Sequence, residues 1–196
     1  MSELNLPKEL KEEISNTIFR AVTENPWIIL TLKRAIVKDG LIEYALTLEP
    51  LIFRHIKHPS IPISYKAVEL EGTNLRFVPR SHISKRLCEL AVKSNPRAIL
   101  YVPDKYRDED MEIQCFDLDP SLLEYFEVDD DYFIQRLDEN PSIVRYKKTL
   151  DESIICEAIK RDYNIALYFD KLTPKMKKIL DEYYPQVVNM LPNYKR

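Results

Sequence analysis

A residue pattern that recurs about every 22 to 24 positions constrains this chain more than any other feature of its sequence. Eight anchor positions, most of them proline, mark the pattern: Pro26, Pro50, Gly72, Pro96, Pro120, Pro141, Tyr163 and Pro185. The anchors follow one another at nearly constant steps in the sequence, as these residue numbers show. Self-similarity at such a short period is typical of a solenoid, in which each repeat buries its apolar face only against its neighbours.

The columns of this repeat separate candidate core residues from the rest. Three positions after the anchor, all eight repeats carry an apolar residue: Ile29, Phe53, Leu75, Ile99, Leu123, Val144, Ala166 and Val188. Five positions before the anchor, six repeats carry Ala or Cys, and Arg136 and Leu180 are the exceptions. These columns predict a continuous core, with small residues that allow neighbouring helices to approach closely.

An aromatic residue stands five positions after the anchor in five repeats: Phe77, Tyr101, Tyr125, Tyr146 and Tyr168. Tyrosine buries an apolar ring and often keeps its hydroxyl group near water. We therefore expect most of the recurring tyrosines to bury their rings in the core and at the elbows of the repeats.

The residue before the anchor is usually Asn or Asp, as in Asn95 before Pro96. Asn and Asp tolerate the left-handed conformation that ends a helix, and the proline that follows is preset for the first turn of a new one. Each repeat is therefore predicted to be a helix, an elbow and a shorter helix. Residues typical of helix starts follow in the links: Ser84, Asp108, Asp129, Thr149 with Glu152 as a capping box, and Thr173 before Pro174.

These features predict an all-α fold, an α-solenoid of about eight short helix-elbow-helix repeats in a single domain over residues 1–196. Residues 1–24 are predicted to form an N-terminal capping helix, beginning at Leu6, that leads into the first repeat. Residues 185–196 are predicted to form a truncated C-terminal cap. The chain contains only two glycines, which fits compact helices better than a sheet of tight hairpins.

Charge is distributed in blocks that the net charge of −3 conceals. Residues 51–100 hold nine Lys or Arg and three acids, a net of +6, whereas residues 104–139 hold three and fourteen, a net of −11. Acids of the second block form a candidate partner-binding surface, the acidic rim: Asp104, Asp108, Glu109, Asp110, Glu127, Asp129, Asp130 and Asp131. The rim could attract a basic protein surface or imitate nucleic-acid phosphates, and plain solvation is the alternative.

The basic block offers a second candidate surface. Arg54, Arg76 and Arg145 stand four positions after their anchors and Arg97 lies nearby, so a discontinuous basic face could bind nucleic acid. The acidic pI of the whole chain argues against this alternative. Trp27 is a candidate binding anchor, since Trp is typical of interface hot spots, although packing within the cap is the favoured interpretation.

Residues typical of enzymes and metal sites are sparse. The chain contains no GxGxxG, GxxxxGK[ST], HExxH or GxSxG motif. His55 and His58 could share one helical face, but a metal site needs three or four ligands, so a solvated link is favoured. Cys88, Cys115 and Cys156 form no CxxC pair and are expected to be reduced thiols that serve as small core residues in a cytoplasmic protein. We therefore expect no catalytic residue, cofactor, metal or membrane span.

Residues 89–126 carry a resemblance to a known kind of repeat. Its best matches are Ala91, Val92, Asn95, Pro96, Leu100 and Tyr101, with weaker ones at Ala158, Ile159, Leu167 and Tyr168. In these residues the chain resembles the short helical repeats of unknown function found in bacterial, phage and large-virus proteins. Their units look like Ala-Val, two variable residues, Asn-Gly or Asn-Pro, then Leu or Ile and Tyr or Phe. The resemblance implies a helical-repeat fold and no catalytic residue, and Arg136 and the proline-rich second repeat depart from it.

The sequence therefore predicts a non-enzymatic module that binds a partner protein through a charged solenoid face. The resemblance to phage and viral repeats implies an accessory factor that inhibits a host protein. The alternative is a nucleic-acid-binding repeat protein that uses the basic face of residues 51–100.

Overall fold

A computed structural model describes residues 8–33, 37–126, 128–137, 139–146 and 150–194. These residues form helices and the links between them, with no β-strand in the described ranges, which confirms the all-α prediction. The chain divides into two compact units, Met1–Cys115 and Phe116–Arg196, referred to below as the first and the second unit.

The elements alternate between longer α-helices and short 3₁₀ helices. The α-helices are α1 (Lys8–Glu24), α2 (Asp39–Leu48), α3 (Ile61–Leu70), α4 (Lys85–Ser94), α5 (Glu109–Leu118), α6 (Asp130–Arg136), α7 (Glu152–Arg161) and α8 (Pro174–Tyr183). The 3₁₀ helices are η1 (Pro26–Leu30), η2 (Pro50–His55), η3 (Gly72–Phe77), η4 (Arg80–His82), η5 (Pro96–Tyr101), η6 (Asp104–Tyr106), η7 (Pro120–Glu124), η8 (Pro141–Tyr146), η9 (Tyr163–Tyr168) and η10 (Val188–Met190).

The repeat pattern of the sequence coincides with this alternation. Seven of the eight anchors are the first residue of a 3₁₀ helix, namely of η1, η2, η3, η5, η7, η8 and η9. The eighth, Pro185, begins a turn that leads into η10. The residue three positions after the anchor is buried in all eight repeats, so this core column is confirmed.

The residue before the anchor adopts a conformation other than the predicted one. Asn95 is extended, with φ −150° and ψ 114°, and His58 is the only non-glycine residue in the described ranges with a positive φ. The left-handed prediction is wrong because a following proline disfavours helical conformations in the residue before it. The extended Asn95 instead caps the second helix, since its Oδ1 accepts a hydrogen bond from the N–H of Arg97 at 3.0 Å.

The predicted start residues fall at the helix starts that the structure describes. Side-chain oxygens of Ser84, Asp108, Asp129 and Thr173 each accept a backbone N–H of the helix that follows. Thr149, and Leu6 and Pro7 of the predicted capping helix, lie outside the described residues. At α7 the cap is Asp151, which the sequence analysis missed and which accepts the N–H of Ser153 at 2.8 Å.

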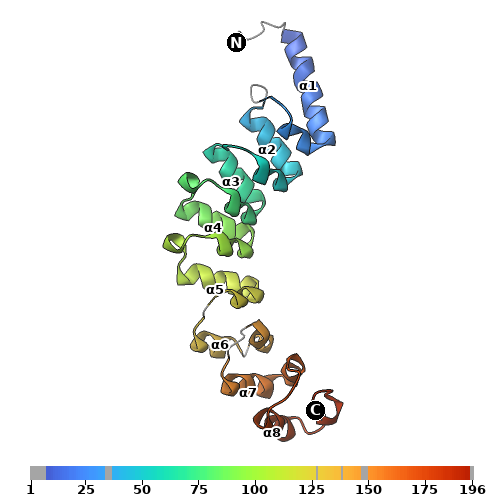
Figure 1. Ribbon diagram of the computed structural model, residues 1–196, viewed down its shortest axis with the longest axis vertical. Helices are drawn as coiled ribbons and strands as arrows, with labels where there is room; N and C mark the ends of the chain where they lie inside the picture. Colours follow the sequence, from blue (N-terminus) through green and yellow to red (C-terminus); the bar gives the residue numbers. More distant parts are fainter. Residues whose placement is uncertain (1–7, 34–36, 127, 138, 147–149, 195–196) are drawn as a thin grey trace. The chain divides into compact units, whose positions relative to one another are not determined.

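In the first unit the α-helices pack in chain order, α1 on α2, α2 on α3 and α3 on α4 (Figure 1). The short helices η1, η2, η3 and η5 pack in the same order. Ala45, Ala67 and Ala91 have no exposed surface, which confirms the small-residue column for these three repeats, whereas Ala21 of the first repeat is half-buried. The closest approach is at Gly72, where a Cβ atom would lie 2.1 Å from the carbonyl oxygen of Ala91. Any side chain at Gly72 would therefore collide with the backbone of α4.

Polar side chains join successive repeats. The buried Asn74 donates from Nδ2 to the carbonyl oxygen of Pro50 at 3.2 Å, one repeat earlier. Glu71, which precedes η3, accepts a hydrogen bond from Nδ2 of Asn95 at 2.9 Å, one repeat later. Buried polar groups that are paired in this way fix the register between neighbouring repeats.

In the second unit, η7, η8 and η9 pack in chain order and α7 packs on α8. Phe133 in α6 and Leu137 just after it are fully buried, whereas Arg136 is partly exposed. The guanidinium group of Arg136 pairs with Asp117 at 3.0 Å and with Glu139 at 3.1 Å. The exception in the small-residue column is accommodated because this long side chain reaches two carboxylates outside the core.

Candidate functional site

The 3₁₀ helices of the first unit expose the same two positions of each repeat. In η2, η3 and η5 the residues two and three positions after the anchor are buried, and the residues four and five positions after it are exposed. In η2, for example, Ile52 and Phe53 are buried and Arg54 and His55 are exposed. The outer row is the name used below for the residues four and five positions after the anchor in η2, η3 and η5: Arg54, His55, Arg76, Phe77, Leu100 and Tyr101.

Four of the five aromatic residues of this column are exposed, and the fifth, Tyr146, is half-buried. Phe77 and Tyr101 are 37% and 36% exposed, and in the second unit Tyr125 and Tyr168 are 63% and 44% exposed. The prediction that these rings lie in the core is wrong for these four residues, which stand at the last residue of a 3₁₀ helix or just after it, where the chain leaves the buried pair. Large apolar surfaces are thus left open at a regular place in the repeat.

Arg76 connects two of the exposed rings. Its guanidinium carbon lies 4.7 Å from the ring centroid of Phe77 and 5.4 Å from that of Tyr101, one repeat later. A cation over an aromatic face at an exposed site contributes about 0.5–1 kcal/mol. The contacts favour one arrangement of the arginine and the two rings, so this part of the outer row is partly ordered before binding.

A basic pocket of about 480 Å³ lies beside the outer row. Its lining comes from η3 and η4 of one repeat and from η5 and η6 of the next. Three cationic, two tyrosine and four apolar residues line it: Arg76, Arg80, Lys105, Tyr101, Tyr106, Leu75, Val78, Ile83 and Pro103. The lining includes no carboxylate.

The three cations of the basic pocket form no ion pair with a carboxylate of the described ranges. Lys105 instead lies 4.4 Å from the ring centroid of Tyr106. Lys85 in the same unit differs, because its ammonium group pairs with Asp108 at 3.0 Å. The basic pocket therefore concentrates positive charge that the protein itself leaves uncompensated.

The pocket depends on the longer links of two repeats. The dipeptides Val78-Pro79 and Val102-Pro103 precede η4 and η6, and both valines are buried. These turns occur in the repeats that begin at the anchors Gly72 and Pro96, and both repeats are longer than those of the second unit. The recurring Val-Pro dipeptide was the sequence signal for this pocket, and it was missed.

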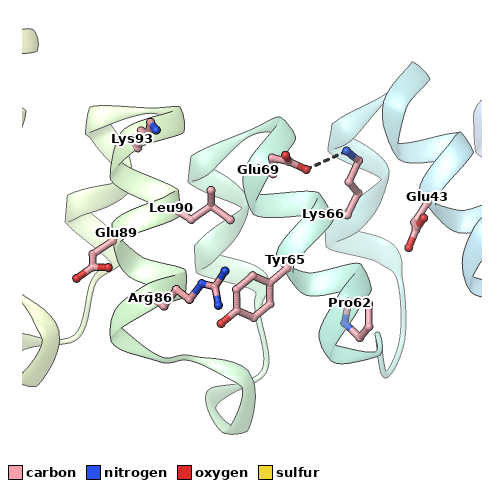
Figure 2. A pocket seen from close by; sticks show the side chains of 9 residues that line it. All are labelled: Glu43, Pro62, Tyr65, Lys66, Glu69, Arg86, Glu89, Leu90 and Lys93. Atoms are coloured by element: carbon pink, nitrogen blue, oxygen red, sulfur yellow. Dashed lines mark hydrogen bonds and ion pairs between the residues drawn. The ribbon is translucent and has the colours of Figure 1, made fainter.

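A second pocket, about 690 Å³ in volume, lies over the outer surfaces of α2, α3 and α4 (Figure 2). Its charged lining residues are three acids and three bases: Glu43, Glu69, Glu89, Lys66, Arg86 and Lys93. Lys66 pairs with Glu69 at 2.8 Å, and Tyr65 and Arg86 point toward one another in Figure 2. Because its charges balance, this mixed pocket shows no preference for an anionic or a cationic ligand.

The acidic rim is divided between the two units. Asp104, Asp108, Glu109 and Asp110 belong to the first unit, Asp129, Asp130 and Asp131 belong to the second, and Glu127 lies outside the described residues. All seven described acids are exposed, but several have local roles. Asp104 pairs with Arg107 at 2.7 Å, and hydrogen bonds from Lys85 and from the N–H of Met111 lower the pKa of Asp108.

The predicted basic face is also divided. Arg54, Arg76 and Arg97 are exposed in the first unit, where Nε of Arg54 donates to His55 at 2.8 Å. Arg145 belongs to the second unit and lies 5.6 Å from the ring of Tyr168. The structure adds Arg80 and Lys105 beside Arg76, and neither was singled out from the sequence.

Trp27 is partly buried and packs against the core cluster that contains Ile29 and Ala45. Its ring meets that of His55 edge-on, with 5.6 Å between the centroids. Trp27 therefore has a packing role, and the ring of His55 extends that contact to the start of the outer row.

The histidines and cysteines occupy positions without metal-site or nucleophile geometry. Helix η2 ends at His55, and His58 follows in a link with φ 54°, so the two imidazoles do not share a helical face as the spacing suggested. No group of three or more His, Cys, Asp or Glu gathers as a metal site in the part of the chain that the structure describes. Cys88, Cys115 and Cys156 are buried free thiols, and burial raises the pKa of Cys88 and of Cys115 to about 11. They are the small core residues that the sequence predicted.

None of the described helices is long and apolar enough to cross a membrane. Comparison of the chain with protein-family models, with curated proteins and with solved structures found no match. The surfaces of the chain itself are therefore the basis for assigning a function.

Proposed function

We propose that this chain is a non-enzymatic protein-interaction module, built as an α-solenoid of short helical repeats. It binds an extended segment of a partner protein along the outer row of its first unit. The observation that supports this proposal is the regular exposure of Arg and aromatic residues at the same two positions of successive 3₁₀ helices. Solenoids present such repeated positions as long binding surfaces.

The residue types of the outer row suit a protein partner. Arg, Tyr and Phe are enriched at protein interfaces, and Arg and Tyr are typical of the hot spots that contribute most of the binding energy. Arg76 already holds Phe77 and Tyr101 in place through its contacts with both rings. A surface that is ordered before binding loses less conformational entropy when the partner docks.

The acidic rim is the competing surface for a protein partner. Asp129, Asp130 and Asp131 could attract a basic partner through long-range electrostatic steering. Reversing these three charges to Lys separates the two surfaces, because the outer row is unchanged in that variant. We expect partner capture to be retained; its loss would move the binding site to the acidic rim.

The resemblance to repeats of phage and viral proteins extends the proposal to a biological role. We propose that the chain is an accessory factor that inhibits a host protein by occupying one of that protein's surfaces. In this role the chain needs no catalytic residue or cofactor of its own.

A nucleic-acid-binding function is the second candidate. The observation that favours it is the net charge of +6 over residues 51–100 together with exposed rings beside Arg76. Single-stranded nucleic acids bind to grooves that combine cations with aromatic stacking surfaces. Such binding would weaken steeply as the salt concentration rises, because it releases counterions.

Affinity capture from a lysate of the source organism, with nuclease treatment and a salt series, tests the proposed function. We expect a stoichiometric protein to remain bound after nuclease treatment and to be lost from the variant Phe77→Ser with Tyr101→Ser. The matched control is Tyr125→Ser, which removes an exposed ring from the second unit and should leave capture unchanged. Capture that disappears with nuclease would instead establish the nucleic-acid candidate.

A further inference from the structure

We infer that the basic pocket selects the partner by binding an acidic side chain of an extended peptide segment. Arg76, Arg80 and Lys105 hold the carboxylate, and the neighbouring part of the segment runs along the outer row. This inference rests on the proposed function and names the chemistry of the partner.

The charge of the pocket points to an anionic ligand. Arg76, Arg80 and Lys105 converge on one pocket whose lining holds no carboxylate. Some other cations of the same unit are paired with acids, such as Lys66 with Glu69 and Lys85 with Asp108. Like-charged groups gathered without counter-charges repel one another, and a carboxylate ligand removes that repulsion while forming charge-assisted hydrogen bonds with the two guanidinium groups.

The size and apolar lining of the pocket indicate that it binds an acidic side chain together with the next residue of the peptide. A volume of about 480 Å³ exceeds what one carboxylate fills. Leu75, Val78 and Ile83 contribute apolar surface beside the cations. An acidic residue followed by an aliphatic or aromatic one would satisfy both parts of the lining, since ligand sites combine apolar walls with a few polar groups that fix orientation.

The aromatic contacts favour a peptide over a nucleic acid. The bases of a single-stranded nucleic acid bind aromatic side chains by stacking on an uncovered face of the ring. Arg76 lies over Phe77 and Tyr101, and Lys105 lies over Tyr106, so a cation already covers one face of each ring.

The extent of the positive charge favours a short ligand. Four acids of the same unit lie within five positions of Lys105 in the chain: Asp104, Asp108, Glu109 and Asp110. A nucleic acid carries a charge at every nucleotide and would meet this acidic stretch, whereas an acidic peptide can confine its charge to the pocket.

The experiment measures fluorescence anisotropy of three labelled probes with the full chain. The probes are a short, otherwise uncharged peptide with a single Glu followed by Leu, the same peptide with Gln in place of Glu, and an oligothymidylate of matched length. We expect the Glu peptide to bind at least about tenfold more tightly than either of the other probes, because only it pairs with the cations without meeting the acidic stretch. Equal binding of the Gln peptide, tighter binding of the oligothymidylate, or no binding of the Glu peptide would each overturn the inference.

Two double variants locate the binding. Arg80→Glu with Lys105→Glu reverses two charges of the basic pocket and should weaken binding of the Glu peptide by about tenfold or more. Arg86→Glu with Lys93→Glu makes the same change of charge in the mixed pocket and should leave the affinity within about twofold. Thermal melts show whether each variant is folded. If the charge reversal in the basic pocket prevents folding, the milder variant Arg80→Gln with Lys105→Gln replaces it. Equal weakening by both charge reversals would contradict a site in the basic pocket.

A second copy of this chain is the remaining occupant to exclude, because residues 104–139 carry a net charge of −11. We expect sedimentation to show a monomer. Self-association of the natural chain that disappears in the Arg80→Glu, Lys105→Glu variant would mean that the pocket binds another copy, and the inference would fail.

The outcomes separate this inference from the proposed function. If capture of the partner protein depends on Phe77 and Tyr101 but not on Arg80 and Lys105, the proposed function stands and the acidic-peptide site fails. If no protein is captured but the Glu peptide binds as described, the site stands and the assignment of a protein partner fails.

Discussion

Arg76 in the first unit and Arg145 in the second make the same contact in different surroundings. Each stands four positions after its anchor and lies over an aromatic ring of its own repeat and one of the next, at 4.7 and 5.4 Å for Arg76 and at 4.5 and 5.6 Å for Arg145. The repeat of Arg76 runs from Gly72 to Pro96 and is longer than the repeat of Arg145, and its extra length forms a turn that encloses the basic pocket. The repeat thus supplies a common exposed contact, and in the repeat of Arg76 the link that follows lines a pocket beside it.

The small-residue column shows a second difference between the units. Ala91 is fully buried, and its carbonyl oxygen lies against Gly72. Arg136 occupies the equivalent position in the second unit and pairs with Asp117. The repeat of Ala91 therefore depends on a close backbone approach, whereas the repeat of Arg136 accommodates a long charged side chain, and four substitutions test this difference.

The largest effect is expected for Ala91→Arg. The new side chain would put a charge where no solvent-exposed surface exists, and no carboxylate is placed to receive it. We expect the free energy of unfolding to fall by about 4 kcal/mol. Urea unfolding followed by circular dichroism measures the change. An unchanged melting temperature would mean that α4 does not bury this face.

Gly72→Ala tests the same contact from the other side. A Cβ atom 2.1 Å from the Ala91 carbonyl oxygen and 2.9 Å from the Asn95 nitrogen forces the backbone apart, and we expect a loss of about 3 kcal/mol. Gly40→Ala is the matched control, because a Cβ atom there meets nothing within 4 Å. Since Gly40 is in α2, this control should be neutral or stabilising by up to about 1 kcal/mol. Equal effects of the two substitutions would refute the close approach.

Arg136→Ala should have a smaller effect in the second unit. The substitution removes two partly exposed ion pairs and leaves Phe133 and Leu137 in the core. Pairs of this kind contribute little, so we expect a loss of no more than about 1 kcal/mol in the same unfolding experiment. A loss as large as that of Ala91→Arg would show that Arg136 is as essential to its repeat as Ala91 is.

The smallest effect is a pH dependence at Glu71, which joins two repeats of the first unit. Burial raises the pKa of Glu71, but hydrogen bonds from Thr73 and from Asn95 outweigh it, so the pKa lies below its ordinary value of 4.5. A lowered carboxyl pKa stabilises the fold above pH 4.5, and this contribution is lost as the pH falls through the pKa of the folded state. Glu71→Gln should therefore be less stable than the natural chain near pH 7, by less than about 1 kcal/mol, and the difference should shrink in acid. A difference that is constant from pH 7 to below about pH 4 would contradict this role.

Side-chain identity alone was sufficient to predict the core columns. Ile99 and Ala91 are buried because apolar and small residues recur at one place in the repeat, and this holds whatever the exact helix type. The exposure of Tyr101 was missed because its recurrence at one place in the repeat was interpreted as burial, whereas this place is the end of the 3₁₀ helix, beyond the buried residues Ala98 and Ile99. The extended elbow at Asn95 was missed because the preference of Asn for left-handed backbone was weighed above the restriction that Pro96 imposes.

The candidate site was predicted only in part. Arg76 was identified from its column, whereas Arg80 and Lys105 lie in links that vary in length and therefore fall outside any column. The path of the backbone at η4 and η6 determines which residues line the pocket. This path cannot be predicted from residue spacing.

Hydrogen–deuterium exchange of the chain, alone and in complex with the captured partner, would show which surface binds. We expect slower exchange in the complex over residues 74–83 and 98–106, which contain the basic pocket and most of the outer row. Peptides over the mixed pocket in α3 and α4, and over residues 109–126 and 128–131, should exchange as in the free chain. Slower exchange confined to the mixed pocket or to the acidic rim, with residues 74–83 and 98–106 unchanged, would contradict a partner-binding role for the outer row.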